Sequence, residues 1–471
     1  MTGETGQVTP SEAPDELDPS VWRIAVVAIF GTLLSQLDAT IVNVSLSSLA
    51  RDLHSNLSTI QWVTSGYLLA LTLILPLNGW LVDRIGGRAL YLWCFTTFTL
   101  SSALCGLAWS ARSLIGFRVL QGLSGGLLAP MAQMMIARVA GRHMARVVGY
   151  VAAPVLLAPI LGPVVAGAIL AHGSWRWLFL VNLPVGALAA LLAVLFLPDD
   201  RGETRRRNLD WLGLAFLSPG LVLLLYGSER FGESTGRWVI AASGTLLAAF
   251  FWIAMRKGDR ALVDLGLFRR KAFSAAALTQ FLSNGALFAG QMLIPVYLIE
   301  ACGRSPSAMG FMLAPLGLGM MVTYPSLGAL TQRFGIRRVS AGGAFLALTA
   351  TLPFLFLVSH GPNGLLVAFA LFFRGMGQGG VGIPSMSAAY ASVDRQHLPT
   401  ASTSLNIVQR LGGPTLTTLC ATVLGWRLEV TPANETGLSP YAWAFLFLCG
   451  SHALTFVAAT RLPLRAGAVE S

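Results

Sequence analysis

The chain has 471 residues, of which only 11% are charged, against about 25% in soluble globular proteins. Apolar residues make up 54% of it, and its mean hydropathy is +0.66. These values exclude a soluble enzyme, a disordered scaffold and a disulfide-rich secreted module. They indicate a protein that crosses a bilayer many times, since one spanning helix needs about 20 mostly apolar residues.

The net charge of +11 does not indicate a nucleic-acid-binding protein, because the basic residues stand in short clusters between apolar runs. The five cysteines lie within or beside those runs without CxxC spacing, so we expect neither disulfides nor a metal site. The polar first 20 residues do not resemble a cleavable signal peptide. The sequence contains no P-loop, HExxH, nucleophile elbow or dinucleotide-binding loop, which argues against an enzyme, an ATP-driven pump and a bound cofactor.

Apolar runs of helical length follow one another along the chain, separated by charged or Gly- and Pro-rich joints. Eight predicted spans cover residues 22–48, 59–81, 89–109, 113–137, 146–171, 175–197, 209–228 and 237–255. Six more cover residues 273–299, 307–330, 338–358, 363–391, 400–426 and 440–461. The sequence therefore predicts an all-α polytopic membrane protein with fourteen spans.

The basic residues predict how these spans are oriented. With the N-terminus in the cytoplasm, 22 of the 32 Lys and Arg residues fall on the cytoplasmic side, seven on the far side and three inside spans. Cytoplasmic loops of membrane proteins carry such an excess of Lys and Arg. We therefore expect both termini in the cytoplasm and an even number of spans, a condition that twelve spans would also satisfy.

An internal repeat favours fourteen spans over twelve. The joints Gly79–Arg88 and Gly328–Arg338 share the frame G-x-L-x-x-R-x-G, and Phe-Arg recurs in glycine-rich runs at Arg118 and Arg374. The copies are 249 and 256 residues apart, whereas six spans need roughly 180 residues, so two spans are inserted between them. The predicted parts are a cytoplasmic tail (1–20), a six-helix bundle (21–200), two inserted helices (201–256), a cytoplasmic amphipathic linker (257–272), a second six-helix bundle (273–461) and a cytoplasmic tail (462–471).

Several motifs resemble those of a known family. GWLVDRIGGR (Gly79–Arg88) resembles the loop signature G-x-L-a-D-R-x-G-R-R of the major facilitator superfamily, with Gly87 in place of one closing base. Three stretches are similar to signatures of its fourteen-helix drug:proton antiporters, the QacA/EmrB-like group: LDATIVNVSL (Leu37–Leu46), WRWLFLVNLPVG (Trp175–Gly186) and VDLGLFRRKAF (Val263–Phe273). LGPVVAGAI resembles their antiporter motif G-P-x-x-G-G through Gly162, Pro163 and Gly167.

Asp38 and Arg118 are the candidate proton-coupling residues. Asp38 is the only acid well inside a predicted span, where burial favours the protonated form and allows it to take up and release a proton. A nearby Arg118 would oppose this effect, so that separation of the pair would switch the protonation of the carboxyl group. The resemblance implies such coupling between the arginine of span 4 and the acid of span 1. The alternative is a structural role for each residue.

Polar positions inside other spans are candidates for a substrate cavity. The first span has two polar stripes on nearly opposite faces, of which one could line the cavity while the other packs against a neighbour. Arg374 could be structural, since its half has no intramembrane acid, and Arg410 could contact an anionic group or brace its helix. The full set of candidates is Gln36, Asn43, Gln121, Arg374, Gln378, Asn406 and Arg410.

The charged joint after the second span is a candidate gate. Asp83 is expected near a helix N-terminus, where the helix dipole and neighbouring bases favour a carboxylate. Such a cluster can latch two helical bundles in one state and release them in another; a solvated loop is the alternative. The gating candidates are Gly79, Asp83, Arg84, Gly86, Arg88 and, in the second copy, Arg333.

These observations predict a monomeric transporter of the bacterial cytoplasmic membrane that works by alternating access. We expect it to export lipophilic small molecules, with cations as candidate substrates, in exchange for protons, the proton gradient being its energy source. Its expected partners are the substrate, protons and the lipid bilayer. One alternative is a dedicated exporter or importer of a single metabolite on the same fold; another is a passive channel or a non-transporting receptor.

Overall fold

The computed structural model describes residues 18–465 except 201, 203, 205–207, 259, 260, 305, 362 and 431–438. Every regular element in this part of the chain is helical, which confirms the predicted all-α class. The first half contains α1 (Pro19–Asp52), α2 (Leu57–Ile74), α3 (Asn78–Ile85), α4 (Gly87–Gly106), α5 (Ala111–Ala140), α6 (Met144–Val155), α7 (Ala158–His172), α8 (Trp177–Leu180) and α9 (Asn182–Phe196). The remainder contains α10 (Trp211–Glu229), α11 (Ser234–Lys257), α12 (Lys271–Val296), α13 (Pro306–Phe334), α14 (Ile336–His360), α15 (Gly364–Ala391), α16 (Leu398–Val430) and α17 (Pro440–Ala459).

Local sequence signals set several helix ends. Side chains of Asp18 and Asn56 accept hydrogen bonds from the first turns of α1 and α2, at 2.8 and 2.7 Å. Gly86 and Gly335 close α3 and α13 with φ of +85° and +83°, a left-handed conformation that glycine adopts without a steric penalty. These two residues are the last glycines of the repeated frame G-x-L-x-x-R-x-G. The repeat therefore encodes the same turn twice.

Twelve helices of the described part are long and apolar enough to cross a membrane. The predicted spans 146–171 and 400–426 are not among them, so the structure does not support the predicted count of fourteen. The first of these is divided into α6 and α7, of 12 and 15 residues, each shorter than the roughly 20 residues that a span needs. The second, α16, is long, but its first half carries a run of polar side chains between Thr400 and Arg410.

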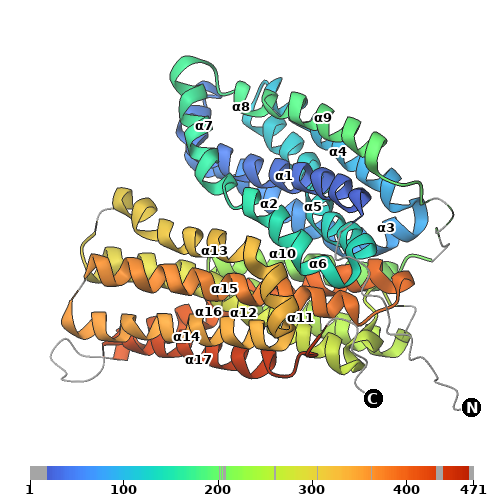
Figure 1. Cartoon of the computed structure of the whole chain (residues 1–471). Coiled ribbons are helices and arrows are strands. Elements are labelled where there is room, and N and C mark those ends of the chain that lie inside the picture. The colour runs from blue at the N-terminus through green and yellow to red at the C-terminus, as the bar shows by residue number, and fades with distance from the viewer. Residues whose placement is uncertain are drawn as a thin grey trace, which may run out of the picture.

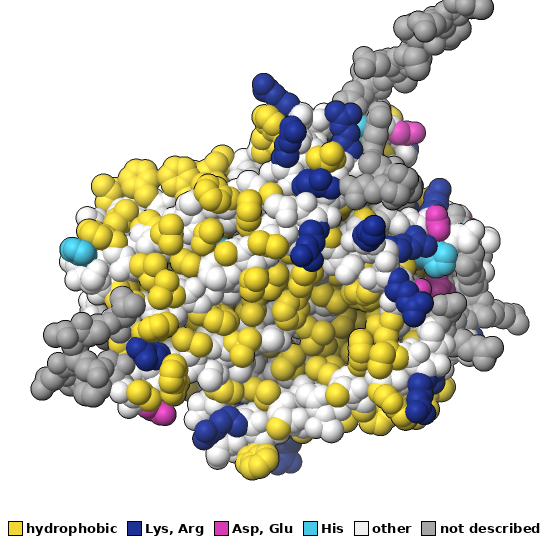
Figure 2. All heavy atoms as spheres, turned by 90° about the horizontal axis from the view of Figure 1, so that it is seen from below, with side chains coloured by type: hydrophobic (Ala, Val, Ile, Leu, Met, Phe, Trp, Pro, Cys, Tyr) yellow, Lys and Arg dark blue, Asp and Glu magenta, His cyan; other side chains and the backbone are white. Residues whose placement is uncertain are grey.

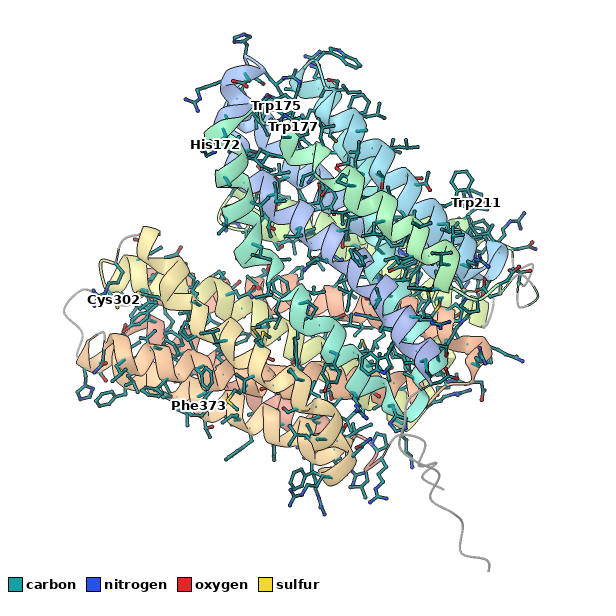
Figure 3. The ribbon with its side chains drawn as sticks, turned by 45° about the horizontal axis from the view of Figure 1, so that its top comes forward. His172, Trp175, Trp177, Trp211, Cys302 and Phe373 are labelled. Carbon is teal, nitrogen blue, oxygen red and sulfur yellow. The ribbon has the colours of Figure 1, made fainter. Side chains whose placement is uncertain are left out.

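The helices form two bundles with the inserted pair beside them. Helices α1 to α9 make one bundle and α12 to α17 the other (Figure 1). The bundles meet at the end where α1 begins and α17 ends, which we call the terminal end, and diverge towards the opposite, far end (Figure 1). Figure 3 shows His172, Trp175 and Trp177 at the far tip of the first bundle and Cys302 at that of the second.

The outer surface is apolar, as expected for a protein surrounded by lipid. Figure 2 shows a broad field of hydrophobic side chains on the face of the second bundle, with Lys and Arg gathered mainly towards one end. Phe345 and Phe356 on α14 and Leu454 on α17 are large apolar side chains of this bundle, each more than half exposed. A continuous apolar surface of this kind is unfavourable in water and favourable in a bilayer.

Hydrogen bonds to backbone groups and a close helix contact join the bundles near the terminal end. Thr403 Oγ1 accepts a hydrogen bond of 2.8 Å from the Gly79 N–H, and Ser402 Oγ donates one of 3.2 Å to the Pro130 carbonyl. Helix α6 of the first bundle also packs against α13 of the second, where Gly149 lies against the backbone of Tyr324. The predicted gating glycine, Gly79, is therefore part of the contact that holds this end closed.

The inserted helices bridge the two bundles. Helix α10 contacts both α2 and α16, and the Ser218 hydroxyl donates a 2.9 Å hydrogen bond to the Leu73 carbonyl of the first bundle. The buried carboxylate of Asp210, the N-cap of α10, accepts from Lys257 at the end of α11 and from the Leu262 N–H of the linker. One carboxylate thus ties both inserted helices to the segment that leads into the second bundle.

This tie predicts a pH dependence of stability. Burial alone would raise the pKa of Asp210, but hydrogen bonds from Lys257, Gly213 and Leu262 outweigh it and lower the pKa. The stabilisation is therefore complete above the ordinary aspartate pKa of about 3.9 and is lost as the pH falls through the lower folded-state value. We expect the Tm in detergent to fall more steeply below about pH 4 for the wild type than for Asp210→Asn. Equal slopes would contradict this role.

Candidate functional site

The structure brings the two charged residues predicted for proton coupling together. Asp38 lies near the middle of α1 and Arg118 in α5, and their side chains are 1% and 0% exposed. Arg118 NH1 donates to Asp38 Oδ2 in a close ion pair. A buried carboxylate and a buried guanidinium each carry a large desolvation cost, which their contact offsets.

Two amide side chains complete the surroundings of the carboxylate. Asp38 Oδ1 accepts from Asn182 Nδ2 at 2.8 Å and from Gln121 Nε2 at 3.1 Å. Asn182 also donates to Ser102 Oγ at 3.1 Å, and Gln121 Oε1 accepts from Arg118 at 2.9 Å. Arg118, Gln121 and Asn182 therefore all donate hydrogen bonds to the Asp38 carboxylate.

Arg118 also links the network to α2. Its Nε donates to the Val63 carbonyl at 3.1 Å, and its guanidinium lies 4.0 Å from the centre of the Tyr67 ring. The Tyr67 hydroxyl donates in turn to the Ser35 carbonyl of α1 at 3.2 Å. Arg118 can contact α2 because the two helices pack closely at Gly122. A Cβ on Gly122 would lie 2.5 Å from the Tyr67 carbonyl oxygen, so only glycine lets α5 approach α2 this closely.

The two polar stripes of the first span have different surroundings. Gly31, Ser35, Asp38 and Ser45 are all buried within the first bundle. On the opposite face Gln36 is exposed, and Thr40 packs against α7, where its hydroxyl lies 3.3 Å from the Ala158 carbonyl. Asn43 lies in α1, but its side chain is outside the described part of the structure. Gln36 is therefore the cavity candidate of this span that the structure leaves accessible.

The remaining cavity candidates are mostly enclosed. Gln121 belongs to the ion-pair network, and the buried Gln378 accepts a hydrogen bond from Ser283 at 2.9 Å. Asn406 donates to its own helix at Ser402 and points towards Gln133 of the first bundle, at 3.5 Å. Such enclosed amides hold helices together in this conformation.

Arg410 lies at a different kind of position from these amides. It is half-buried in α16 and close enough to the Tyr67 hydroxyl for the two groups to interact electrostatically. It makes no ion pair with any residue in the described part of the chain. Of the cationic candidates, Arg410 is therefore the one placed between the bundles without a fixed partner.

Arg374 does not form an ion pair with any described residue. Its side chain is fully buried, NH2 donates to the Ala286 carbonyl at 2.8 Å, and Nε and NH1 have no hydrogen-bond partner in the described structure. The repeat therefore preserves a buried arginine in both bundles, but among the described residues only the first bundle provides a carboxylate beside it.

The gating loop is organised by an acid that the sequence analysis missed. Asp200, just after α9, accepts from the Gly87 and Arg88 N–H groups at the start of α4, at 2.7 and 3.2 Å, and from Arg138 at 3.2 Å. The carboxylate at this helix N-terminus is thus Asp200, whereas Asp83 lies in the last turn of α3. The sequence signal that could have identified Asp200 is its position directly after a predicted span, on the side of the membrane where several arginines are predicted.

The other gating candidates lie around this acid. Gly86 supplies the left-handed turn against the Asp200 carboxylate, and Arg88 NH2 donates to the Val194 carbonyl at 2.8 Å. Arg84 and Arg333 are exposed and lie over the rings of Trp80 and Phe334. The structure therefore gathers Gly86 and Arg88 around Asp200 and leaves the arginines of both copies, Arg84 and Arg333, on the surface.

The predicted antiporter motif lies in α7. Gly162 packs against Thr40 of α1, where a Cβ would lie 2.2 Å from the hydroxyl oxygen. Gly167 is exposed, with no atom within 4 Å of a built Cβ. The side chain of Pro163 is outside the described part. One of the two glycines is thus required by helix packing, and the other is not.

Comparison with known proteins identifies the family. Residues 28–417 match the family model described as Major Facilitator Superfamily. The chain belongs to this superfamily. A "Multidrug resistance protein B homolog" of Mycobacterium tuberculosis is 33% identical over 443 residues, which cover 92% of this chain and 82% of the relative. A "Putative multidrug resistance protein MdtD" of Salmonella typhi is 34% identical over 330 residues, or 68% of this chain and 69% of the relative.

Solved structures of the superfamily share the fold. The human organic anion transporter MFSD10 (TETRAN) has a TM-score of 0.64 at 17% identity, covering 94% of this chain and all (100%) of its own. The proton:xylose symporter XylE has a TM-score of 0.62 at 14% identity, covering 93% of this chain and 94% of its own. These findings confirm a multi-pass membrane transporter rather than an enzyme. They do not distinguish the fourteen-helix QacA/EmrB-like group, which stays a prediction.

Proposed function

We propose that this transporter is a proton-coupled antiporter that exports lipophilic small molecules, including cations, by alternating access. The observation that carries the proposal is the buried Asp38 carboxylate, held by Arg118, Gln121 and Asn182 from two other helices. The names of the relatives, which are multidrug resistance proteins, support drugs as the class of substrate. We propose no cofactor: one proton crossing the membrane supplies about 2.3 kcal/mol per 100 mV.

The geometry suggests how protonation is coupled to movement. In this conformation the ion pair is intact, the terminal end is closed and the bundles diverge towards the far end. A proton on Asp38 removes the charge that compensates Arg118, so the network loses its main attraction and α1, α5 and α9 can rearrange. Release of the proton on the other side restores the pair. The carboxyl group thus favours one arrangement of the bundles when ionised and another when protonated.

We also propose a fourteen-helix topology with both termini in the cytoplasm. Helices α6 and α7 together lead from the terminal end to the far end, and α16 leads the same way with its polar residues turned towards other helices. In the predicted topology, 22 basic residues fall on the side of the N-terminus and seven on the opposite side, which supports a cytoplasmic location for the terminal end. The structure then represents a state closed to the cytoplasm, in a monomer of the bacterial cytoplasmic membrane.

The alternative is a dedicated exporter or importer of a single metabolite. Transport assays with a panel of chemically unrelated amphiphiles distinguish the two, since a multidrug transporter moves several of them. Uptake into everted vesicles indicates export from the cell, and a flux without proton dependence indicates a passive channel.

The test of the proposed function is substrate-induced proton movement in everted membrane vesicles. We expect the wild type to release protons from acidified vesicles when a lipophilic cation is added, and Asp38→Asn to show no proton release and no accumulation of the cation. Asp52→Asn is the matched control, since Asp52 is an exposed acid at the end of the same helix. Undiminished transport by a correctly folded Asp38→Asn variant would rule out the proposed role.

A further inference from the structure

The second bundle buries a cation whose charge no described residue balances. Arg374 is 0% exposed, and the guanidinium of arginine stays protonated in proteins. One of its nitrogens donates to the Ala286 carbonyl, whereas Nε and NH1 have no partner in the described structure. Of the described acids between the start of α12 and the end of α17, Glu300 follows α12, Asp394 follows α15 and Glu429 lies in the last turn of α16. Such a charge is costly to bury alone.

The repeat shows what is missing beside Arg374. In the first bundle, Asp38 on α1 faces Arg118. In the second bundle Arg374 faces Gly290 on α12: a Cβ built on Gly290 would lie 1.9 Å from Arg374 NH2. Asp38 and Gly290 are 252 residues apart, which falls between the repeat separations of 249 and 256. Gly290 therefore occupies the position that corresponds to Asp38, and the guanidinium fills the space of the absent side chain.

A second unpartnered polar group lies near the arginine. His452 on α17 is 1% exposed, and its Nε2 has no hydrogen-bond partner in the described structure. The charge of Arg374 acts on this ring, and also on the thiols of Cys420 and Cys449. The site thus combines three buried nitrogens without partners, from α15 and α17. All the nitrogens of Arg374 are donors, and a neutral histidine can place its N–H on Nε2.

We propose that a small monovalent anion of halide size binds between Arg374 and His452 inside the second bundle. Water could accept hydrogen bonds from these donors, but only an anion also compensates the charge of the guanidinium. Full burial of both side chains excludes a bulky organic anion from the position. The anion would supply the negative charge that Asp38 supplies in the first bundle. The site would hold the second bundle rigid while the first bundle takes up and releases protons.

The test uses the purified full-length transporter in detergent without substrate. We expect chloride or bromide to raise the midpoint of thermal unfolding by about 2–4 °C relative to gluconate, with saturation as the halide concentration rises. Gly290→Asp places a carboxylate against the guanidinium, which can shift because it is the free end of a flexible side chain. This variant should lose the halide dependence. Gly290→Asn, of the same size but uncharged, should keep it.

Further variants make the outcome decisive. Arg374→Met removes the charge that requires an anion, so its unfolding midpoint should be the same in chloride and gluconate. Halide dependence that persists in Arg374→Met, or a wild type with equal midpoints in both salts, would overturn the proposal. A shift caused by an amphipathic carboxylate but not by chloride would also overturn it, because the ligand would then be a substrate. These measurements do not depend on transport, so their failure would leave the proposed antiport untouched.

Discussion

Arg118→Leu is expected to lower the free energy of unfolding by about 3–5 kcal/mol and to abolish transport. The substitution leaves the Asp38 carboxylate buried with only the amides of Gln121 and Asn182 as partners. An uncompensated buried charge is far more costly than the loss of a few contacts. Denaturant titration in mixed detergent micelles measures the effect. The matched control is Arg112→Leu, at an exposed position of the same helix, and should change stability by less than about 0.5 kcal/mol.

The double variant Asp38→Asn, Arg118→Leu separates stability from transport. Without either charge the network no longer contains a desolvated ion, so most of the lost stability should return. Under the proposed proton coupling, transport should not return, because the variant has no carboxyl group to carry the proton. If Arg118→Leu were as stable as Arg112→Leu, or if the double variant were the least stable of the series, the ion pair would not hold the bundle together as described.

The sequence analysis named both charged members of this site and Gln121, but it did not name Asn182. Asp38 and Arg118 are conspicuous because a charge inside an apolar run is costly and needs a partner. Asn182 carries no such signal: it stands in the apolar stretch Trp175–Gly186, where an amide can face solvent, lipid headgroups or a neighbouring helix. Only the packing of α9 against α1 shows that it donates to Asp38.

Hydropathy predicts the helices whose apolar side chains face lipid, and these make up most of the fold. All but two of the predicted spans correspond to helices that are long and apolar enough to cross a membrane. The exceptions have identifiable causes. Pro154 precedes the break between α6 and α7, and the polar side chains of α16 are buried against other helices rather than exposed. An average over a sequence window does not show which side of a helix faces lipid.

Gly149→Ala is expected to abolish transport by preventing closure at the terminal end. Gly149 in α6 packs against α13 so closely that a Cβ would lie 2.3 Å from the Tyr324 carbonyl oxygen. Backbone atoms of two packed helices cannot move aside as a flexible side chain can, so the methyl group must separate the bundles. The variant should therefore populate states open at the terminal end.

Labelling of a cysteine introduced at Ser402 measures this opening, because Ser402 is fully buried between the bundles in the closed state. We expect Gly149→Ala to increase the rate of maleimide labelling by about tenfold, which corresponds to a shift of about 1.4 kcal/mol in the opening equilibrium. Gly116→Ala on α5 is the control, since its Cβ meets no atom within 4 Å. Unchanged labelling and transport in Gly149→Ala would show that the α6–α13 contact does not have to form during the cycle. A loss of transport with increased labelling would instead identify a single methyl group as sufficient to hold the bundles apart, as expected if alternating access depends on backbone-to-backbone contact at this end.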